Sequence, residues 1–335
     1  MKKLIVALIS VFFIAGVMVP RASGVSVADD SVPQDTALNV IAWFSKRDTV
    51  VYWIQESEWK IQPGDTVKRS GVSTQVMVTV IDSTAAGYKM DYTFMDVRGD
   101  SLADPELGGL QNRLVEYLGR KIVGTTIRFE TDEYGEITKF DNLGQIKKQA
   151  KSLFRDAIKE MEKEPWVKEL KGLGFNLRDY TKHVDADQLV EGYLEEIKLL
   201  FMCHGNVYEP GESTVHEDET DSQYANDTYT SATIDDDGCY HIMANVESKV
   251  PQADVKALVM GVVDEIDDED LKANFDANFD AQVDTDCAVN SYLQIDFLPN
   301  GWPYEVVKQE ATMIGGRGKV EQKRIYLDSY SFYNY

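Results

Sequence analysis

The segment Gln62-Pro63-Gly64-Asp65-Thr66 returns later in the chain as Glu209-Pro210-Gly211-Glu212-Ser213. The same elements follow each copy in the same order: a β-hairpin, a helix and a second β-hairpin. Self-similarity over a long spacing is the sequence signature of a duplicated unit. The chain is therefore predicted to contain an internal repeat. The alternative is that β-rich proteins reuse such turns generically.

The predicted strands share a two-residue alternation in which β-branched and aromatic residues are frequent. They are residues 50–59, 75–82, 88–97, 125–130, 136–140, 229–234, 240–246, 292–297, 304–307 and 320–335. Turns such as Asp235-Asp236-Asp237-Gly238 and Leu298-Pro299-Asn300-Gly301 join neighbouring strands. Because Asp, Asn and Gly adopt the backbone conformations that tight turns need, these pairs are predicted to be antiparallel hairpins.

Other segments place apolar residues at helical spacing. They are residues 107–118, 143–161, 189–201 and 255–263. The central stripe of Leu143, Ile146 and Ala150 continues to residue 161 and predicts an amphipathic helix. Pro165 interrupts this helix, and Asp185 is a suitable N-cap for the next one. A pair of helices is therefore expected between the two halves.

These elements predict an α+β fold with two related antiparallel β-sheet units, bridged by a central helical segment. The inner faces of the sheets are expected to pack on the helices. The predicted parts are a signal peptide at 1–24, a flexible N-terminal segment at 25–37, a first β-rich unit at 38–141, a helical bridge at 142–205 and a second β-rich unit at 206–335.

The N-terminus has the pattern of a secretory signal peptide. Lys2 and Lys3 precede an apolar run from Leu4 to Val19, and the small residues Ala22 and Gly24 suit cleavage after Gly24. The run is at the short end of what spans about 30 Å of hydrocarbon. We therefore expect an exported protein, periplasmic or extracellular, with no stable transmembrane anchor after cleavage.

The balance of charge argues against one class of partner. The 335-residue chain has a formal net charge of −23. A strongly acidic surface repels phosphate backbones. Nucleic acid is therefore not expected to bind.

The three cysteines, Cys203, Cys239 and Cys287, all lie in the C-terminal half. Export permits a disulfide, but an odd count leaves at least one thiol unpaired or intermolecular. Cys239 with Cys287 is the predicted pair. The sequence has no Cys-x-x-Cys or Cys/His spacing of the kind that binds zinc.

No cofactor is predicted, and Ca²⁺ is the one metal that the composition allows. The acidic stretch 264–286 offers the oxygen ligands that Ca²⁺ prefers. Asp235, Asp237 and Gly238 match three positions of an EF-hand loop, but Ala244 occupies the place of the bidentate glutamate. An EF-hand is therefore excluded, and solubilising acidic loops are the alternative to a Ca²⁺ site.

No catalytic motif is present. His216-Glu217 begins like a zinc-protease motif, but Thr220 stands where the second histidine is required. The glycines between Gly315 and Gly318 are not placed between a strand and a helix, so they predict no nucleotide site. Paired carboxylates, as in glycoside hydrolases, meet only in space, so a hydrolase remains an alternative.

The Pro-Gly-Asp/Glu segments, the Asp-x-x-Gly hairpins and the central helices ending at Leu200-Phe201 resemble a family of secreted or periplasmic proteins of Gram-negative bacteria. No activity is assigned to that family, so the resemblance implies an α+β fold and no functional residue. A looser similarity is to lipoprotein carriers, in which a curved antiparallel sheet holds an acyl chain against helices. That similarity is an analogy of fold.

The leading functional hypothesis is an exported, non-enzymatic envelope or secreted protein. It would bind a ligand, with lipid-like molecules among the candidates, or a protein partner of the envelope, because sheet-plus-helix folds offer apolar clefts. The alternatives are a hydrolase acting on envelope or dietary polymers, and a structural or assembly protein. Five tryptophans could line a binding surface or lie in the core: Trp43, Trp53, Trp59, Trp166 and Trp302.

Overall fold

The computed structural model describes residues 37–99, 117, 119–164, 167–168, 186–218, 224–256, 287–314 and 316–333. Several predictions concern residues outside these ranges and stay predictions. They are the signal peptide at 1–24, most of the flexible segment at 25–37, most of the helix at 107–118, the N-cap Asp185, the helix at 255–263 beyond Lys256, and the acidic stretch 264–286.

Strands make up most of the described chain. They are β1 (Leu38–Asn39), β2 (Thr49–Gln62), β3 (Asp65–Thr84), β4 (Gly87–Gly99), β5 (Thr126–Thr131), β6 (Ile137–Phe140), β7 (Val207–Tyr208), β8 (Gly211–Glu217), β9 (Asn226–Ile234), β10 (Tyr240–Val250), β11 (Cys287–Phe297), β12 (Pro303–Ile314) and β13 (Arg317–Ser331). The long helices are α3 (Leu143–Met161) and α6 (Ala186–Phe201). No helix among the described residues is long and apolar enough to span a bilayer.

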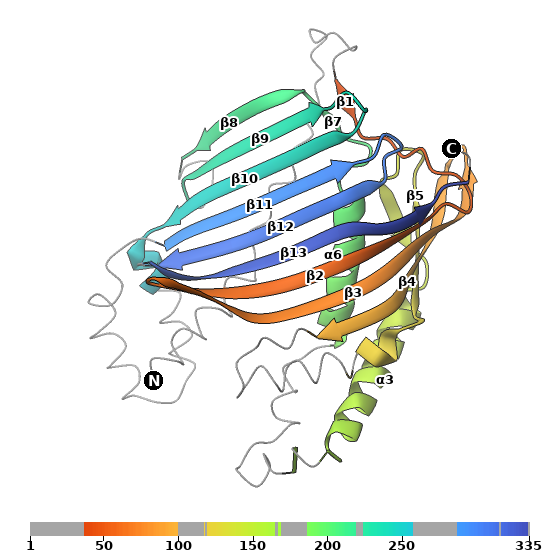
Figure 1. Ribbon diagram of the computed structural model, residues 1–335, viewed down its shortest axis with the longest axis horizontal. Coiled ribbons are helices and arrows are strands. Elements are labelled where there is room, and N and C mark those ends of the chain that lie inside the picture. The colour runs from red at the N-terminus through yellow and green to blue at the C-terminus, as the bar shows by residue number, and fades with distance from the viewer. Residues whose placement is uncertain are drawn as a thin grey trace.

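Eleven strands form one antiparallel sheet in the order β6-β5-β4-β3-β2-β13-β12-β11-β10-β9-β8 (Figure 1). β1 and β7 form a separate two-stranded sheet. The predicted strands and the two central helices are confirmed, but the two halves are not separate sheets. They are joined because β13 pairs with β2 from Ser331 opposite Thr49 to Gly318 opposite Ile61.

The internal repeat stays a prediction. The first half of the sheet runs β6-β5-β4-β3-β2 and the second runs β12-β11-β10-β9-β8, an order that neither requires nor forbids a duplication. The two copies of the Pro-Gly segment that led to this prediction occupy different positions in the fold. Gly64, with φ of 78°, lies in the turn between β2 and β3, whereas Gly211 begins the edge strand β8.

One row of directly paired side chains crosses seven strands and defines the buried face of the sheet. The row consists of Ala232, Ile242, Ile295, Val306, Ile325, Ile54 and Thr74, from β9 to β3. All seven are buried. We call them the aliphatic row. Burial of these side chains and of the apolar stripe of α6 supplies the main stabilisation of the fold.

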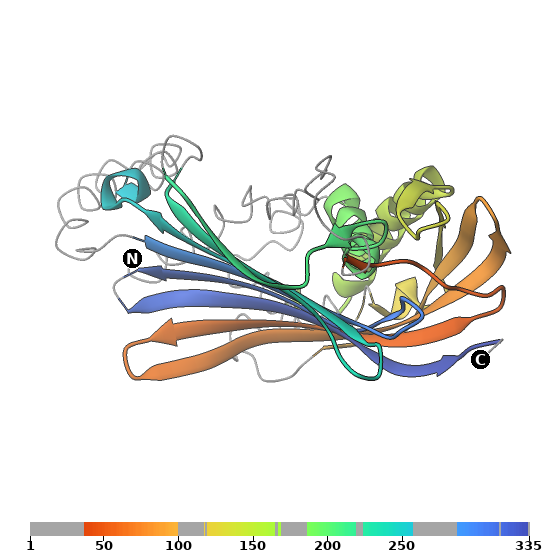
Figure 2. The ribbon, with the colours of Figure 1, turned by 90° about the horizontal axis from the view of Figure 1, so that it is seen from above.

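The helices cover only part of this face. Figure 2 shows that the sheet is curved and that α3 and α6 lie in its concave side, toward one end of the strands. Val190, Leu194 and Ile197 of α6 belong to the same core as the isoleucines and the valine of the aliphatic row. The helices therefore do not bridge two sheets. They pack on one sheet, whose long strands continue beyond them.

An aromatic cluster holds the chain segment before β2 against the turn between β11 and β12. The rings of Phe44 and Trp302 stack with centroids 4.0 Å apart, and Phe201 and His204 pack beside them. His204 Nε2 donates to the carbonyl oxygen of Gly301 at 2.9 Å. Burial lowers the pKa of His204 to about 4, so its ring is neutral at physiological pH.

The predicted disulfide is contradicted by the structure. Cys239 immediately precedes β10, whereas Cys287 pairs with Val250 at the other end of that strand. The length of β10, roughly 35 Å at the usual rise per residue, therefore separates the two thiols, far beyond the reach of a disulfide. All three cysteines are free thiols.

Replacement of Gly301 by alanine tests the contact between the two chain segments. Gly301 has φ of 85°, and a Cβ there would collide with the carbonyl oxygen of Ile41. Gly64→Ala is the matched control, since Gly64 has φ of 78° but open space around it. We expect chemical denaturation to show a loss of roughly 3 kcal/mol or more for Gly301→Ala and about 1–2 kcal/mol for Gly64→Ala. Equal losses would contradict the close approach.

Candidate functional site

Beyond the aliphatic row, the concave face of β2, β12 and β13 carries charged side chains in three successive rows. Residues directly opposite each other in an antiparallel pair point to the same face. The rows are Lys308, Lys323 and Glu56, then Glu310, Glu321 and Glu58, then Lys319 and Lys60. We call these eight residues the charged lattice. It contains as many lysines as glutamates.

The lattice arises from charges spaced two residues apart within each strand, which is the period of a strand face. Like charges opposite each other repel, but oppositely charged neighbours compensate for this. Lys319 Nζ lies 2.7 Å from Glu321 and 3.5 Å from Glu58. Lys323 Nζ lies 2.9 Å from Glu56. Lys319 therefore lies between a carboxylate of its own strand and one of the neighbouring strand, whereas Lys323 pairs with the neighbouring strand β2.

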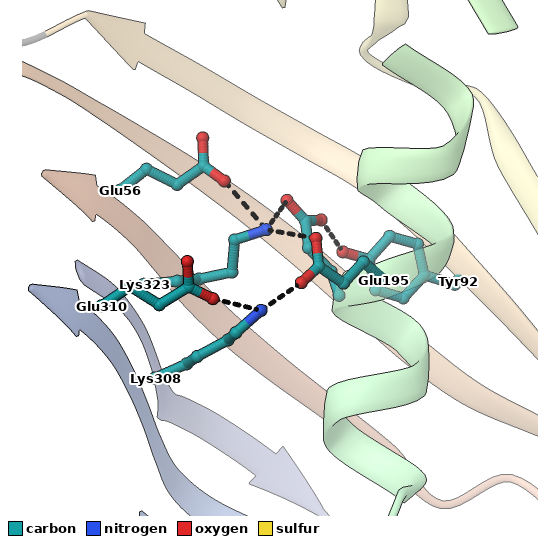
Figure 3. A network of polar contacts seen from close by, with 7 residues as sticks. Glu56, Tyr92, Glu195, Lys308, Glu310 and Lys323 are labelled. Carbon is teal, nitrogen blue, oxygen red and sulfur yellow. Dashed lines mark hydrogen bonds and ion pairs between the residues drawn. The ribbon is translucent and has the colours of Figure 1, made fainter. Parts of the chain in front are cut away.

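Helix α6 adds two carboxylates to the lattice (Figure 3). Lys308 Nζ lies 2.7 Å from Glu195 Oε1 and 3.2 Å from Glu310 Oε1. Lys323 Nζ lies 3.9 Å from Glu195 and 4.0 Å from Glu196. Burial on its own would lower the pKa of Lys323, but the carboxylates of Glu196 and Glu56 outweigh it and raise that pKa. Lys323 is therefore a cation that holds α6 on the sheet.

Glu196 is the most buried acid of the site, with 4% of its surface exposed. The hydroxyl of Tyr92 donates to Glu196 Oε2 at 2.8 Å. Burial raises the pKa of Glu196 to about 7 because the charged form loses its hydration, and Lys323 opposes this shift. Glu196 therefore changes its charge near neutral pH.

A second strip adjoins the charged lattice on the same face. It consists of alternate residues of β10 and β11: Ala244, Val246, Ser248, Val250, Cys287, Val289, Ser291 and Leu293. We call it the uncharged strip. Leu293 lies directly opposite Lys308, and Ser291 lies opposite Glu310. The concave face beyond the aliphatic row therefore has two adjoining strips of contrasting polarity.

The residues that sequence analysis singled out do not form this site. Asp235 Oδ1 accepts from the backbone N–H groups of Asp237 at 3.1 Å and Cys239 at 2.9 Å, so it shapes the hairpin turn. His216 contacts Asp227 on the neighbouring strand at 2.7 Å. No group of three potential metal ligands occurs in the described ranges. The Ca²⁺ site stays a prediction.

The charged lattice was missed by sequence analysis, although part of its signal is visible in one strand. Lys319-Val320-Glu321-Gln322-Lys323 alternates charged and uncharged residues. Such a pattern alone predicts a solvated strand face. Only the pairing of β13 with β2 brings the charges of the β12–β13 hairpin together with those of a strand near the start of the described chain.

No protein-family model matches the chain, and no curated sequence does. Among solved structures, a structure of lipovitellin and its lipid–protein interactions has 10% sequence identity to this chain. Its TM-score is 0.41 over 87% of this chain. This chain covers 26% of that protein. An outer membrane channel from Pseudomonas putida F1 has 9% identity and a TM-score of 0.14, with 88% of this chain and 99% of the channel covered. Likenesses this weak carry no functional argument.

The buried acid makes stability depend on pH in a way that Glu196→Gln removes. Because its pKa is raised from 4.5 to about 7 in the folded protein, ionisation of Glu196 disfavours folding as pH rises through this window. The glutamine variant does not titrate. We therefore expect its unfolding free energy, relative to wild type, to increase from about pH 4.5 to about pH 7 by up to about 3 kcal/mol. Denaturant titrations across this range measure it.

Glu195→Gln is the matched control with the opposite sign. Burial raises the pKa of Glu195, but the hydrogen bond from Lys308 and the nearby lysines lower it further, so that the net shift is downward. Glu195 therefore stabilises the fold above its unfolded pKa, and this contribution disappears as pH falls. The variant should be least stable relative to wild type at neutral pH. If the unfolding free energies of both variants, relative to wild type, changed with pH in the same direction, Glu196 would not titrate as described.

Proposed function

We propose that this chain is an exported, non-enzymatic protein that binds an amphipathic, lipid-like ligand on the concave face of its sheet. The observation that carries the proposal is the contact between the uncharged strip and the charged lattice. Along one line across the sheet, Ala244 and Leu293 are followed directly by Lys308 and Lys323. A molecule with an apolar body and a charged head matches this change of polarity.

The chemistry of each strip selects a different part of the ligand. Small and aliphatic side chains such as Ala244 and Val289, which are half-buried, favour hydrocarbon, because its transfer from water is favourable. With Glu195 and Glu196 of α6, the lattice presents ammonium donors and a larger number of carboxylate acceptors, so it suits a head group that carries both signs of charge better than a simple anion. The side chains of its acids Glu56, Glu310 and Glu321 are 49%, 38% and 43% exposed.

The hydrolase alternative has less support than ligand binding. A hydrolase needs an acid that reaches its substrate, but Glu196, whose pKa is raised to about 7, is 4% exposed and accepts a hydrogen bond from Tyr92. Export rests on the N-terminal pattern of Lys2, Lys3 and the apolar run that follows. A protein partner for the concave face is the alternative occupant, and the experiment below distinguishes it from a lipid.

Val289→Glu tests the uncharged strip. Val289 is half-buried on the concave face, next to Thr312 of β12. Ala288→Glu is the matched control, since its neighbouring side chain is exposed on the opposite face of the same strand. We expect native mass spectrometry of protein purified from its exported fraction to show a bound amphipathic molecule for wild type and Ala288→Glu. A buried charge beside hydrocarbon should lower the affinity of Val289→Glu about tenfold or more.

Circular dichroism and thermal melting must first show that both variants are folded. Extraction with organic solvent then identifies the bound molecule. Wild-type protein that carries no small molecule, or equal ligand loss in both variants, would contradict the proposal. A bound polypeptide in place of a lipid would instead favour the alternative.

A further inference from the structure

The edge strand β8 is open along its whole length. It is the last strand of the sheet on the side away from β6 (Figure 1), and all seven residues from Gly211 to Glu217 are exposed. β8 pairs with β9 through seven consecutive residues with no shift of register. Within the described part of the chain, no strand pairs with its outer side. Such an edge presents unpaired N–H and C=O groups to another strand.

The other edge of the sheet is protected in the ways that natural proteins use. β6 has only four residues, and its pairing with β5 is irregular between Glu130 and Thr131. Lys139 lies in the middle of β6. β8 contains no proline, no lysine and no bulge. The two edges therefore differ in their capacity to accept a further strand.

We propose that β8 pairs antiparallel with β8 of a second copy of this chain, so that the two sheets join across a twofold axis. In the register that uses all seven residues, Thr214 lies opposite the partner's Thr214. Ser213 then lies opposite the partner's Val215, and Glu212 lies opposite the partner's His216. Opposite residues point to the same face, so both sheets continue with matching faces.

The occupant is a second copy because β8 is complementary to itself in this register. The pair of Glu212 with the partner's His216 occurs twice by symmetry, and Thr–Thr and opposite-charge pairs are both favourable across strands. His216 contacts Asp227 of its own copy through Nδ1 at 2.7 Å. The Asp227 carboxylate accepts that hydrogen bond from Nδ1, so Nε2 is the ring nitrogen that donates to the partner's Glu212 when the ring is protonated. The interface involves neither strip of the concave face, so it is independent of the proposed ligand.

Sedimentation velocity of the mature protein over a concentration series tests the interface by charge exchange. We expect the wild type to dimerise. His216→Glu places two glutamates opposite each other at both symmetry-related positions and should weaken the dimer about tenfold. Glu212→Lys should weaken it as well, since lysine then faces histidine. The double variant Glu212→Lys/His216→Glu restores opposite charges and should recover the wild-type dissociation constant within about threefold.

The design separates loss of the interface from loss of the fold. The double variant keeps the glutamate beside Asp227, so its recovery cannot come from repair of the monomer. Ala288→Glu, which adds a glutamate to an exposed site on β11, should leave the dimer unchanged. A wild type that stays monomeric at every concentration would overturn the proposal. So would a dimer that His216→Glu does not weaken or that the double variant does not restore.

Discussion

The pairing of β2 with β13 is the constraint on which the rest of the structure depends. It joins the first long strand of the chain to the last, and it places the two halves of the sheet side by side. Without it, the aliphatic row would be two shorter rows, and the lysines of β13 would have no partners on β2. Because one register shift would turn every side chain of β13 to the other face, this single pairing aligns the core and the charged lattice together.

Helix α6 shows how the core and the polar site are linked. Its apolar residues, such as Leu194 and Ile197, pack in the core, whereas Glu195 and Glu196 reach Lys308 and Lys323. Removing charges from water costs free energy that their mutual attraction only partly returns. An arrangement of this kind contributes more to the placement of α6 than to overall stability. The partly exposed lattice beyond it is then held in a defined geometry.

The two proposals concern different surfaces of the molecule. The concave face changes from uncharged to charged along a line that crosses β11 and β12, and this change is what an amphipathic molecule can recognise. The edge at β8 offers backbone hydrogen bonds and a self-complementary set of side chains. The two lie on different parts of the sheet, so the proposed ligand and the proposed second copy would not compete.

The sequence by itself determined the local elements, because strand alternation, helical spacing and turn residues are properties of neighbours in the chain. The hairpin around Asp235 and the helix that begins at Leu143 were predicted correctly for this reason. Only the tertiary structure decided that the halves form one sheet and that Glu56, Lys308 and Lys323 meet. It also decided that Cys239 and Cys287 lie at opposite ends of the β10–β11 pair. These depend on which distant strands pair and in which register, and many pairings satisfy the same local pattern. The free energy that selects one of them comes from burial of the complete aliphatic row, which exists only after the chain has folded.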